Sequence, residues 1–408
     1  MEEFSKETVA IILAGGKGER LGPLTGHRAK PAVPFAGRFR VIDFVLSNCV
    51  HSGLNKIIVP TQYKSLSLTD HLDEWKNIFS RERNEYLKAV QPQGRTTQDL
   101  EPYTGTADAV YENLYSVVKF KPELDLILAG DHVYKMNYRD LLFLHQKKQA
   151  DLTIAALETT DRDSAVRSGV LLVNQNQQVI GFEEKPQEPK SIPDKPGTFL
   201  ISMGIYVFNH KTMIEELDSD AGDPASRHDF GRNIVPKMVG DGRKVFVFPF
   251  RGYWRDIGTI DAYYAAQMDL VSTVPEFNLY DDDWPWMTFG KQRPSAKIVF
   301  DERIKRSIIS EGCIIDRGEI YGSILSPGVR VGIDAQIIDS VILENVTIGA
   351  GARIVKAIID KKNHIPSASI IEAGNIRFEG EQKEKIEVTP SGIVLIPRYF
   401  EPGEEVLK

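Results

Sequence analysis

Near the start of the chain stands Val9-Ala10-Ile11-Ile12-Leu13-Ala14-Gly15-Gly16-Lys17-Gly18-Glu19-Arg20-Leu21. Its first residues are continuously apolar, which predicts a buried strand, and three glycines follow soon after. Exposed backbone N–H groups at such a turn form a cradle for an anion. Two cationic side chains follow the glycines, Arg20 in the loop itself and Lys30 in the segment 28–32. Both can add charge-assisted contacts to a triphosphate. The stretch therefore predicts a strand that ends in a phosphate-binding loop.

Two better-known phosphate loops do not fit this stretch. A Walker A loop needs four residues between its first glycine and Gly-Lys-Ser/Thr, and the sequence contains no such arrangement. A Rossmann dinucleotide loop built on Gly16 and Gly18 would need glycine or alanine where Leu21 stands. A glycine turn with a purely structural role remains an alternative. The cationic residues that follow the turn favour phosphate binding.

Five more apolar runs follow, separated by segments long enough for helices. Each run is continuous rather than alternating, which is typical of a parallel sheet covered on both faces. We therefore predict an α/β domain over residues 1–275, with a Rossmann-like, mostly parallel sheet. The expected strands are residues 9–13, 56–59, 126–129, 152–156, 204–208 and 245–248.

Past Pro275 the alternation of strands and helices ends, and we expect an extended connector over residues 276–297. After the connector the sequence shows a regular beat, in which apolar residues recur at nearly fixed spacing. Aliphatic residues recur there at steps of six, five, six and six positions: Val331, Ile337, Ile342, Ile348 and Ile354. This beat predicts a left-handed parallel β-helix over residues 298–378, in which each coil stacks its aliphatic residue on the one below. A β-sandwich with irregular strands is the alternative. Residues 379–408 are expected to form a C-terminal tail around a short apolar strand.

Composition narrows the possible partners. A chain of 408 residues is too long for one ordinary core, so two domains are expected. The formal net charge of −7 leaves no surplus of positive charge for nucleic acid or an anionic membrane. The first apolar run is too short to direct export or to span a bilayer. Cys49 and Cys313 indicate neither a disulfide framework nor a thiolate metal site, so we expect a cytoplasmic protein.

Two aspartates are candidate ligands for a divalent metal ion. Asp131 follows the expected strand 126–129, and ligands bind beyond the carboxyl ends of such strands. Asp256 is the natural second carboxylate. Mg²⁺ is normally held by one or two carboxylates together with the phosphates themselves. A helix N-cap is the alternative for either aspartate taken alone.

A charged turn before a proline offers the groups that a sugar phosphate needs. Glu184 is suited to sugar hydroxyls, and Lys185 is suited to a single phosphate as a point charge. An exposed charged turn without a ligand is the alternative.

Taken together, these segments resemble the sugar-nucleotide pyrophosphorylases, and within them the bacterial ADP-glucose pyrophosphorylases. The resemblance extends from the glycine loop to the β-helix. The matching segments are residues 13–21, 28–33, 39–44, 46–49, 103–109, 129–132, 185–186, 202–208, 228–231 and 253–259.

The resemblance implies a catalytic nucleotidyltransferase domain that makes ADP-glucose and pyrophosphate from ATP and glucose 1-phosphate. The implied catalytic residues are Arg20, Lys30, Asp131 and Lys185. The implied ATP-binding residues are Gly15, Gly16, Gly18, Arg20, Lys30, Gln93 and Gly105. The implied glucose 1-phosphate pocket consists of Tyr103, Gly169, Glu184, Lys185 and Ser202, and the Mg²⁺ pair is Asp131 with Asp256. The family also implies a homotetramer that feeds glycogen synthesis and responds to metabolite effectors, with Arg40 and His27 at the effector site.

The chain departs from the family pattern at several positions. His27 stands where the enteric enzymes carry a lysine that binds activators, whereas Arg40 is retained. Pro102 replaces a common tryptophan, and Ser168 replaces the usual aromatic residue before Gly169.

Three other functions stay open at the level of sequence. A sister nucleotidyltransferase would use another nucleoside triphosphate, and a non-catalytic regulatory paralogue would be expected to lose residues that this chain keeps. An acyltransferase would need a reactive histidine in the β-helix, where His364 is the only one.

Overall fold

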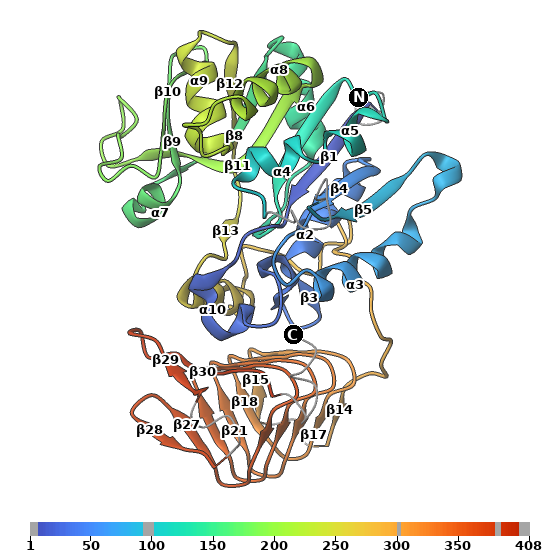
Figure 1. The fold of residues 1–408 in the computed structure, drawn as a ribbon. Helices are drawn as coiled ribbons and strands as arrows, with labels where there is room; N and C mark the ends of the chain where they lie inside the picture. Colours follow the sequence, from blue (N-terminus) through green and yellow to red (C-terminus); the bar gives the residue numbers. More distant parts are fainter. Residues whose placement is uncertain (1–6, 93–101, 300–302, 380–384, 400–408) are drawn as a thin grey trace.

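The computed structural model describes residues 7–92, 102–299, 303–379 and 385–399 of the chain. A mixed domain of helices around a sheet comes first, and a stack of short strands follows it (Figure 1). Within the described segments, no helix combines the length and the apolar character needed to cross a membrane.

A nine-stranded sheet organises the first domain. β1 lies at its centre and pairs in parallel with β4 and β6, and β4 pairs in parallel with β5. β11 runs antiparallel to β6 and β8. The sequence did not predict this direction, because a continuous apolar run indicates burial on both faces of the sheet and does not fix the strand direction. The nine strands are β1 (Thr8–Leu13), β4 (Lys56–Pro60), β5 (Tyr86–Val90), β6 (Leu124–Ala129), β8 (Leu152–Thr159), β9 (Gly169–Val173), β10 (Val179–Glu184), β11 (Phe199–Asn209) and β12 (Val245–Phe250).

Helices cover both faces of this sheet, which confirms the predicted α/β class. Alternate residues of β1 enter different cores: Ala10 and Ile12 pack towards α2, α3 and α6, whereas Val9 and Ile11 pack towards α4, α5, α8 and α9. The helices are α2 (Val41–His51), α3 (Leu66–Trp75), α4 (Thr106–Tyr111), α5 (Leu114–Val118), α6 (Tyr138–Lys147), α7 (Arg162–Arg167), α8 (His210–Ala221), α9 (Val235–Gly240) and α10 (Ile260–Leu270).

The second domain is the predicted left-handed parallel β-helix. Residues of the sequence beat stack on one another: Val331 pairs with Ile348, and Ile337 pairs with Ile354. All five residues of the beat are buried, so they form the interior of the coil.

Three sheets, parallel except for the antiparallel strands β28 and β29, form the sides of the β-helix. The first contains β14 (Lys297–Ile298), β17 (Ile314–Ile315), β20 (Arg330–Val331), β23 (Thr347–Ile348) and β26 (His364–Ile365). The second contains β15 (Ile304–Lys305), β18 (Glu319–Tyr321), β21 (Gln336–Ile338), β24 (Arg353–Val355), β27 (Ile370–Glu372) and β28 (Asn375–Arg377). The third contains β16 (Ile308–Ile309), β19 (Ile324–Leu325), β22 (Val341–Ile342), β25 (Ala357–Ile359), β29 (Glu387–Val388) and β30 (Val394–Ile396).

The expectation of a tail from residue 379 is wrong for its apolar part. β30 pairs in parallel with β25 and is fully buried, so it adds a rung to the third sheet. β28 turns back antiparallel on β27 and interrupts the coil, which is why the sequence beat ends before β30. Residues 380–384 and 400–408 lie outside the described part of the chain.

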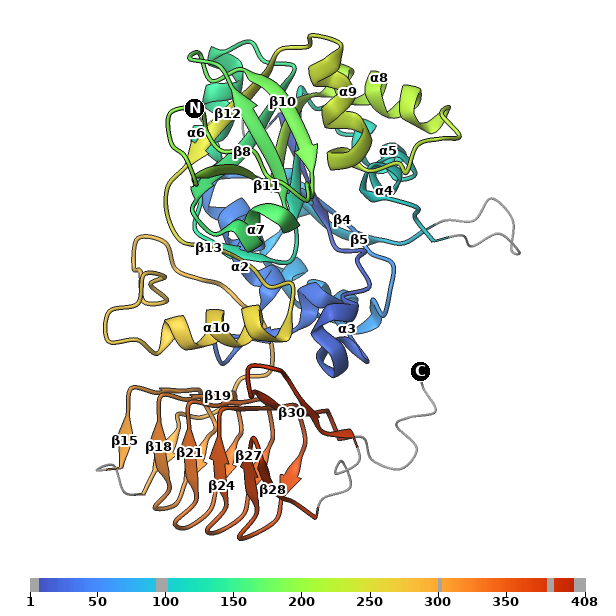
Figure 2. The ribbon, with the colours of Figure 1, turned by 90° about the vertical axis from the view of Figure 1, so that its left-hand side faces the viewer.

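The two domains share one hydrophobic core. The short hairpin of β2 (Pro34–Phe35) and β3 (Phe39–Arg40), together with α2 and α10, packs on the third sheet of the β-helix. Figure 2 shows α10 beside β19 and β30 of that sheet. Phe35, Phe44 and Tyr263 from the first domain belong to the same cluster as Ile324 and Leu395 from the second. We refer to this region as the domain seam.

Candidate active site

The glycine loop leaves β1 in the conformation that its sequence predicts. Gly16 is exposed and has open space where a Cβ would lie, so its backbone is accessible. Gly18 has a φ of +66°, which favours glycine, and it lies against Thr25 and Lys30. The Thr25 hydroxyl donates to the Gly18 carbonyl at 2.9 Å and holds the end of the loop. The loop is therefore an open backbone surface supported from one side.

A cavity of about 510 Å³ adjoins the loop and runs beneath the N-terminal end of α4. Its floor requires Gly105, because a Cβ there would lie 2.2 Å from the backbone oxygen of His228. The predicted residues that line this cavity are Gly15, Gly16, Tyr103, Gly105, Asp131, Glu184 and Lys185.

A second cavity, of about 230 Å³, lies beside the first. The predicted residues that line it are Arg20, Lys30, Asp131, Gly169, Glu184, Lys185, Ser202 and Asp256. Asp131, Glu184 and Lys185 line both cavities, as do Gly204 and Tyr206, so the two spaces meet at these residues. Most of the residues predicted for the nucleotide and sugar pockets are thus brought together at one site.

The sugar side of the site is built around Glu184. A Cβ on Gly169 would lie 2.9 Å from Glu184 Oε2, and a Cβ on Gly231 would lie 2.6 Å from the same oxygen. The two glycines therefore leave room for this carboxylate. Lys185 has a φ of +51°, which is strained for lysine, and its backbone N–H donates to the Ser168 carbonyl at 3.0 Å. Its ammonium lies 3.0 Å from Glu184 Oε1.

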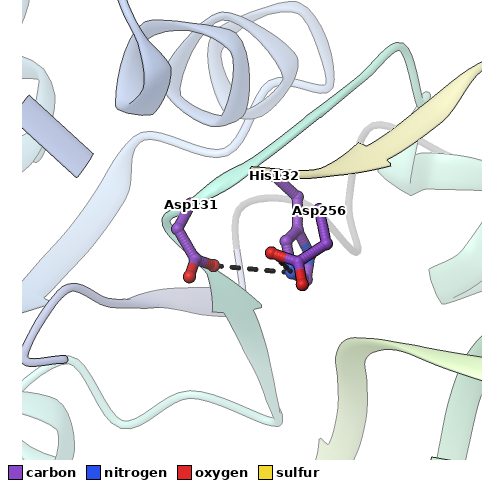
Figure 3. Close-up of side chains that lie close together, drawn as sticks. All are labelled: Asp131, His132 and Asp256. Atoms are coloured by element: carbon purple, nitrogen blue, oxygen red, sulfur yellow. Dashed lines mark ion pairs between the residues drawn. The ribbon is translucent and has the colours of Figure 1, made fainter. Parts of the chain in front are cut away.

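Pairing of two short strands brings the predicted metal ligands together. β7 (His132–Tyr134) pairs antiparallel with β13 (Trp254–Asp256), with His132 opposite Asp256. Asp131 immediately precedes β7, so its carboxylate faces that of Asp256 across the pair (Figure 3). Lys30 Nζ lies between them, 2.6 Å from Asp131 Oδ2 and 3.0 Å from Asp256 Oδ1.

The charges of this cluster stabilise one another. Burial alone would raise the pKa of Asp131, but the Lys30 ammonium and His132 outweigh it and hold that pKa well below its usual range. Burial alone would lower the pKa of Lys30, yet Asp131 and Asp256 raise it above its usual value. The carboxylate and the ammonium are therefore both charged at neutral pH.

The cluster has the chemistry of a divalent metal site. Asp131, His132 and Asp256 each offer a ligand atom, and these atoms all lie within 4.8 Å of one another. Among the described residues this is the only such group of three or more. Gly258 keeps the space beside Asp256 open, because a Cβ there would lie 2.9 Å from Asp256 Oδ2. Two carboxylates with an adjacent imidazole suit a divalent ion.

Of the remaining predicted residues, three lie elsewhere in the structure. Gly18 lines neither cavity and instead supports the loop, and Gln93 lies outside the described residues. Arg40 is at the domain seam, where its guanidinium donates to the Ser67 carbonyl at 2.5 Å. His27 is half-buried and follows the 3₁₀ helix Glu19–Thr25.

Several residues of the site were not predicted from the sequence. His132 adds a third possible metal ligand, and its position directly after Asp131 was an available signal. Tyr206 lines both cavities from β11, where it reads as an ordinary core residue. Asp229 lines the larger cavity and accepts from Thr106, whereas Trp254 lines the smaller one. The segments that contain these residues resembled the family, but no single pattern marked their side chains as ligands.

Comparison with known families agrees with this architecture. The family described as Nucleotidyl transferase matches residues 9–273, and the family described as GlmU-like, C-terminal hexapeptide matches residues 294–396. The fold and the site therefore define a nucleotidyltransferase enzyme. Nucleotidyl transferases generally use a divalent metal.

Curated relatives are similar over nearly the whole chain. A glucose-1-phosphate adenylyltransferase of Rhodopirellula baltica is 44% identical over 97% of this chain and 91% of the relative. The enzymes of the same name from Methylococcus capsulatus and Koribacter versatilis are 43% and 44% identical over 97% of this chain, and over 94% and 96% of their own lengths. The chain belongs to the glucose-1-phosphate adenylyltransferase family, which confirms the resemblance drawn from its motifs.

Proposed function

We propose that this protein joins ATP to glucose 1-phosphate and forms ADP-glucose and pyrophosphate. The observation that carries the proposal is the meeting of the two cavities at Asp131, Glu184 and Lys185. The larger cavity adjoins the glycine loop and has the volume for a nucleotide, and the smaller one has the charged lining for a sugar phosphate. The names of the relatives support the same substrates.

The proposed reaction is an in-line displacement. A phosphate oxygen of glucose 1-phosphate attacks the α-phosphorus of ATP, the bond from that phosphorus to the oxygen bridging the β-phosphate breaks, and pyrophosphate leaves with the bond electrons. The attacking oxygen is already anionic, so no general base is required, and positioning with charge neutralisation carries the catalysis. Lys185 holds the attacking phosphate and Glu184 orients the sugar hydroxyls. The N–H groups of Gly15 and Gly16, together with Arg20, hold the triphosphate.

We propose Mg²⁺ as the divalent ion, held by Asp131 and Asp256. When bound it would offset charge on the triphosphate, as hard oxygen-ligated cations do in such reactions. Lys30 contacts both carboxylates and would keep them oriented towards the centre of the site.

We also propose that Arg40 and His27 belong to an effector site at the domain seam. Arg40 is half-buried there near Arg28, Glu344 and Lys361. Burial lowers the pKa of Lys361, and the nearby positive charges of Arg28 and Arg40 lower it further. Arg28 pairs with Asp360 and Lys361 pairs with Glu344, so Arg40 would supply the positive charge for an effector that carries phosphate or carboxylate groups. We further propose a homotetramer that acts in the cytoplasm and supplies glycogen synthesis, in keeping with the family.

Release of pyrophosphate from glucose 1-phosphate with ATP, UTP, dTTP and GTP in turn tests the proposal. We expect ATP to give the highest kcat/KM. A preference for another triphosphate would identify a sister nucleotidyltransferase. Absence of release with all four, from folded protein supplied with Mg²⁺, would identify a regulatory paralogue and overturn the proposed reaction.

A further inference from the structure

Arg167 stands at the edge of the sugar side of the site without a partner for its charge. It ends α7 and lines both the cavity of about 230 Å³ and a neighbouring cavity of about 370 Å³. Its side chain forms no hydrogen bond and no ion pair with any residue in the described part of the chain, although its charge helps to lower the pKa of Asp161. An exposed arginine often has no protein partner, so the argument rests on what surrounds it.

The charges that line the smaller cavity are unevenly matched. Its four Lys and Arg side chains are Arg20, Lys30, Arg167 and Lys185, and its three carboxylates are Asp131, Glu184 and Asp256. Lys30 is held by Asp131 and Asp256, and Lys185 is held by Glu184 at 3.0 Å. The remaining two cations, Arg20 and Arg167, form no ion pair with a carboxylate of the described residues.

A sugar phosphate needs more positive charge than Lys185 alone supplies. A phosphate monoester carries a charge of about −1.5 to −2 at neutral pH. The charge of Lys185 is already offset by the adjacent Glu184 carboxylate. A second cation on the sugar side would therefore strengthen binding of the phosphate.

Local structure places Arg167 beside Lys185 rather than beside the glycine loop. Ser168, the next residue, accepts the backbone hydrogen bond of Lys185, and Gly169 pairs with Glu184 across β9 and β10. Arg20, in contrast, belongs to the glycine loop segment, and its guanidinium approaches Gly258 beside Asp256. Ser168 lines the cavity of about 230 Å³ and that of about 370 Å³, and its small side chain fills little of the space between these two cavities.

We propose that Arg167 binds the phosphate of the sugar-phosphate substrate together with Lys185. The inference rests on the proposed function, because it assigns a residue to the sugar-phosphate half of that reaction. A guanidinium can donate two parallel hydrogen bonds to phosphate oxygens, and a lysine cannot reproduce this geometry.

Steady-state kinetics of Arg167→Gln test the proposal in both reaction directions. We expect the KM for glucose 1-phosphate to rise at least about tenfold, while the KM for ATP and, in reverse, the KM for pyrophosphate stay within about twofold. Arg167→Lys should recover part of the loss. Arg162→Gln is the matched control, because Arg162 begins the same helix and lines neither the cavity of about 230 Å³ nor that of about 370 Å³. Among the described residues, its side chain donates only to the Gln187 carbonyl.

An unchanged KM for glucose 1-phosphate in Arg167→Gln would overturn the proposal while leaving the proposed function intact. A rise confined to the KM for pyrophosphate would also overturn it, since Arg167 would then serve the leaving group. If the wild type shows no turnover, the proposed reaction fails, and calorimetric titration with glucose 1-phosphate then tests the role of Arg167 separately. Weaker binding by Arg167→Gln than by the wild type would still support the role of Arg167, whereas equal binding, or no binding to either, would contradict it.

Discussion

Arg28 and Asp360 form a buried ion pair across the domain seam, with Arg28 Nη2 at 3.0 and 2.9 Å from the two carboxylate oxygens of Asp360. The side chains are only 5% and 0% exposed. Arg28 stands two residues before Lys30, which contacts both proposed metal ligands. The β-helix thus holds the segment that delivers a cation to the active site.

Asp360→Ala should destabilise the protein by about 3–5 kcal/mol, because it leaves the charge of Arg28 buried without its partner. Denaturant unfolding followed by circular dichroism measures the loss. Glu311→Gln is the control: Glu311 pairs with Arg38 across the same seam, but at 3.7 Å and with Arg38 half-exposed, so its removal should cost less than about 1 kcal/mol. Equal effects of the two substitutions would contradict the importance of the buried pair.

Asp131→Asn should lower turnover by several orders of magnitude and leave the fold intact, because it removes a charged ligand from the centre of the site. Pyrophosphate release measures turnover, and the melting temperature reports on the fold. Asp241→Asn, at the exposed end of α9, provides a comparison outside the site. Activity that stays within about tenfold, or about 1.4 kcal/mol of barrier, would exclude Asp131 as a metal ligand.

Removal of divalent ions should abolish activity without unfolding the protein, since the cluster of Asp131, His132 and Asp256 also contains Lys30 as an internal counter-charge. Dialysis against a chelator, followed by an activity assay and a thermal melt, tests this expectation. Addition of Mg²⁺ should restore turnover. Full activity in the chelated sample would rule out a required metal.

Gly231→Ala should weaken sugar binding, because its Cβ would lie 2.6 Å from Glu184 Oε2 and force that carboxylate to move. We expect a rise of about tenfold in the KM for glucose 1-phosphate with little change in the KM for ATP. Gly240→Ala is the matched control, because a Cβ at that position meets nothing within 4 Å. An unaltered KM in Gly231→Ala would show that Glu184 does not contact the sugar.

His145 should make stability depend on pH in acid solution. Burial lowers its pKa to about 4, although the hydrogen bond with Asn209 acts in the opposite direction. The unfolded chain, with a histidine pKa of about 6.5, takes up a proton first as the pH falls. The contribution of neutral His145 to the stability of the folded protein is therefore complete above about pH 6.5 and is lost between about pH 6.5 and 4.

His145→Gln should reduce the fall in melting temperature between pH 7 and pH 5. The histidine alone changes stability by up to about 1.4 kcal/mol for each pH unit in that window. His364→Gln, at an exposed position of β26, should leave the pH dependence as in the wild type. Parallel melting curves for wild type and His145→Gln would contradict the expectation.

The sequence was most informative where a periodic pattern reports directly on burial. The beat that includes Ile348 and Ile354 predicted the β-helix, because each coil repeats the same contact with its neighbour. The strand of residues 394–396 was missed as a part of that domain. It joins β25 only after the antiparallel turn of β28, and periodicity carries no information across such an interruption.

The sequence predicted the residues of the candidate site more readily than it predicted the contacts between them. Asp131 was predicted from its strand-end position, with Asp256 as the second carboxylate, and the structure brings them together through β7 and β13. Lys30 was expected on the triphosphate, whereas in this structure it bridges the two carboxylates. Contacts between residues so far apart in sequence depend on the packing of the whole sheet, which local patterns do not encode.

The shared core at the seam limits how this protein can be recombined. Phe35, Phe44 and Tyr263 would lose their packing partners if the β-helix were cut away, and Ile324 and Leu395 would face solvent. In a chimaera that exchanges everything after residue 294 for another hexapeptide coil, the side chains on the two sides of the domain seam would therefore not pack against one another. The portable unit in three dimensions includes the hairpin 34–40 and α10, even though the chain order places both within the other half.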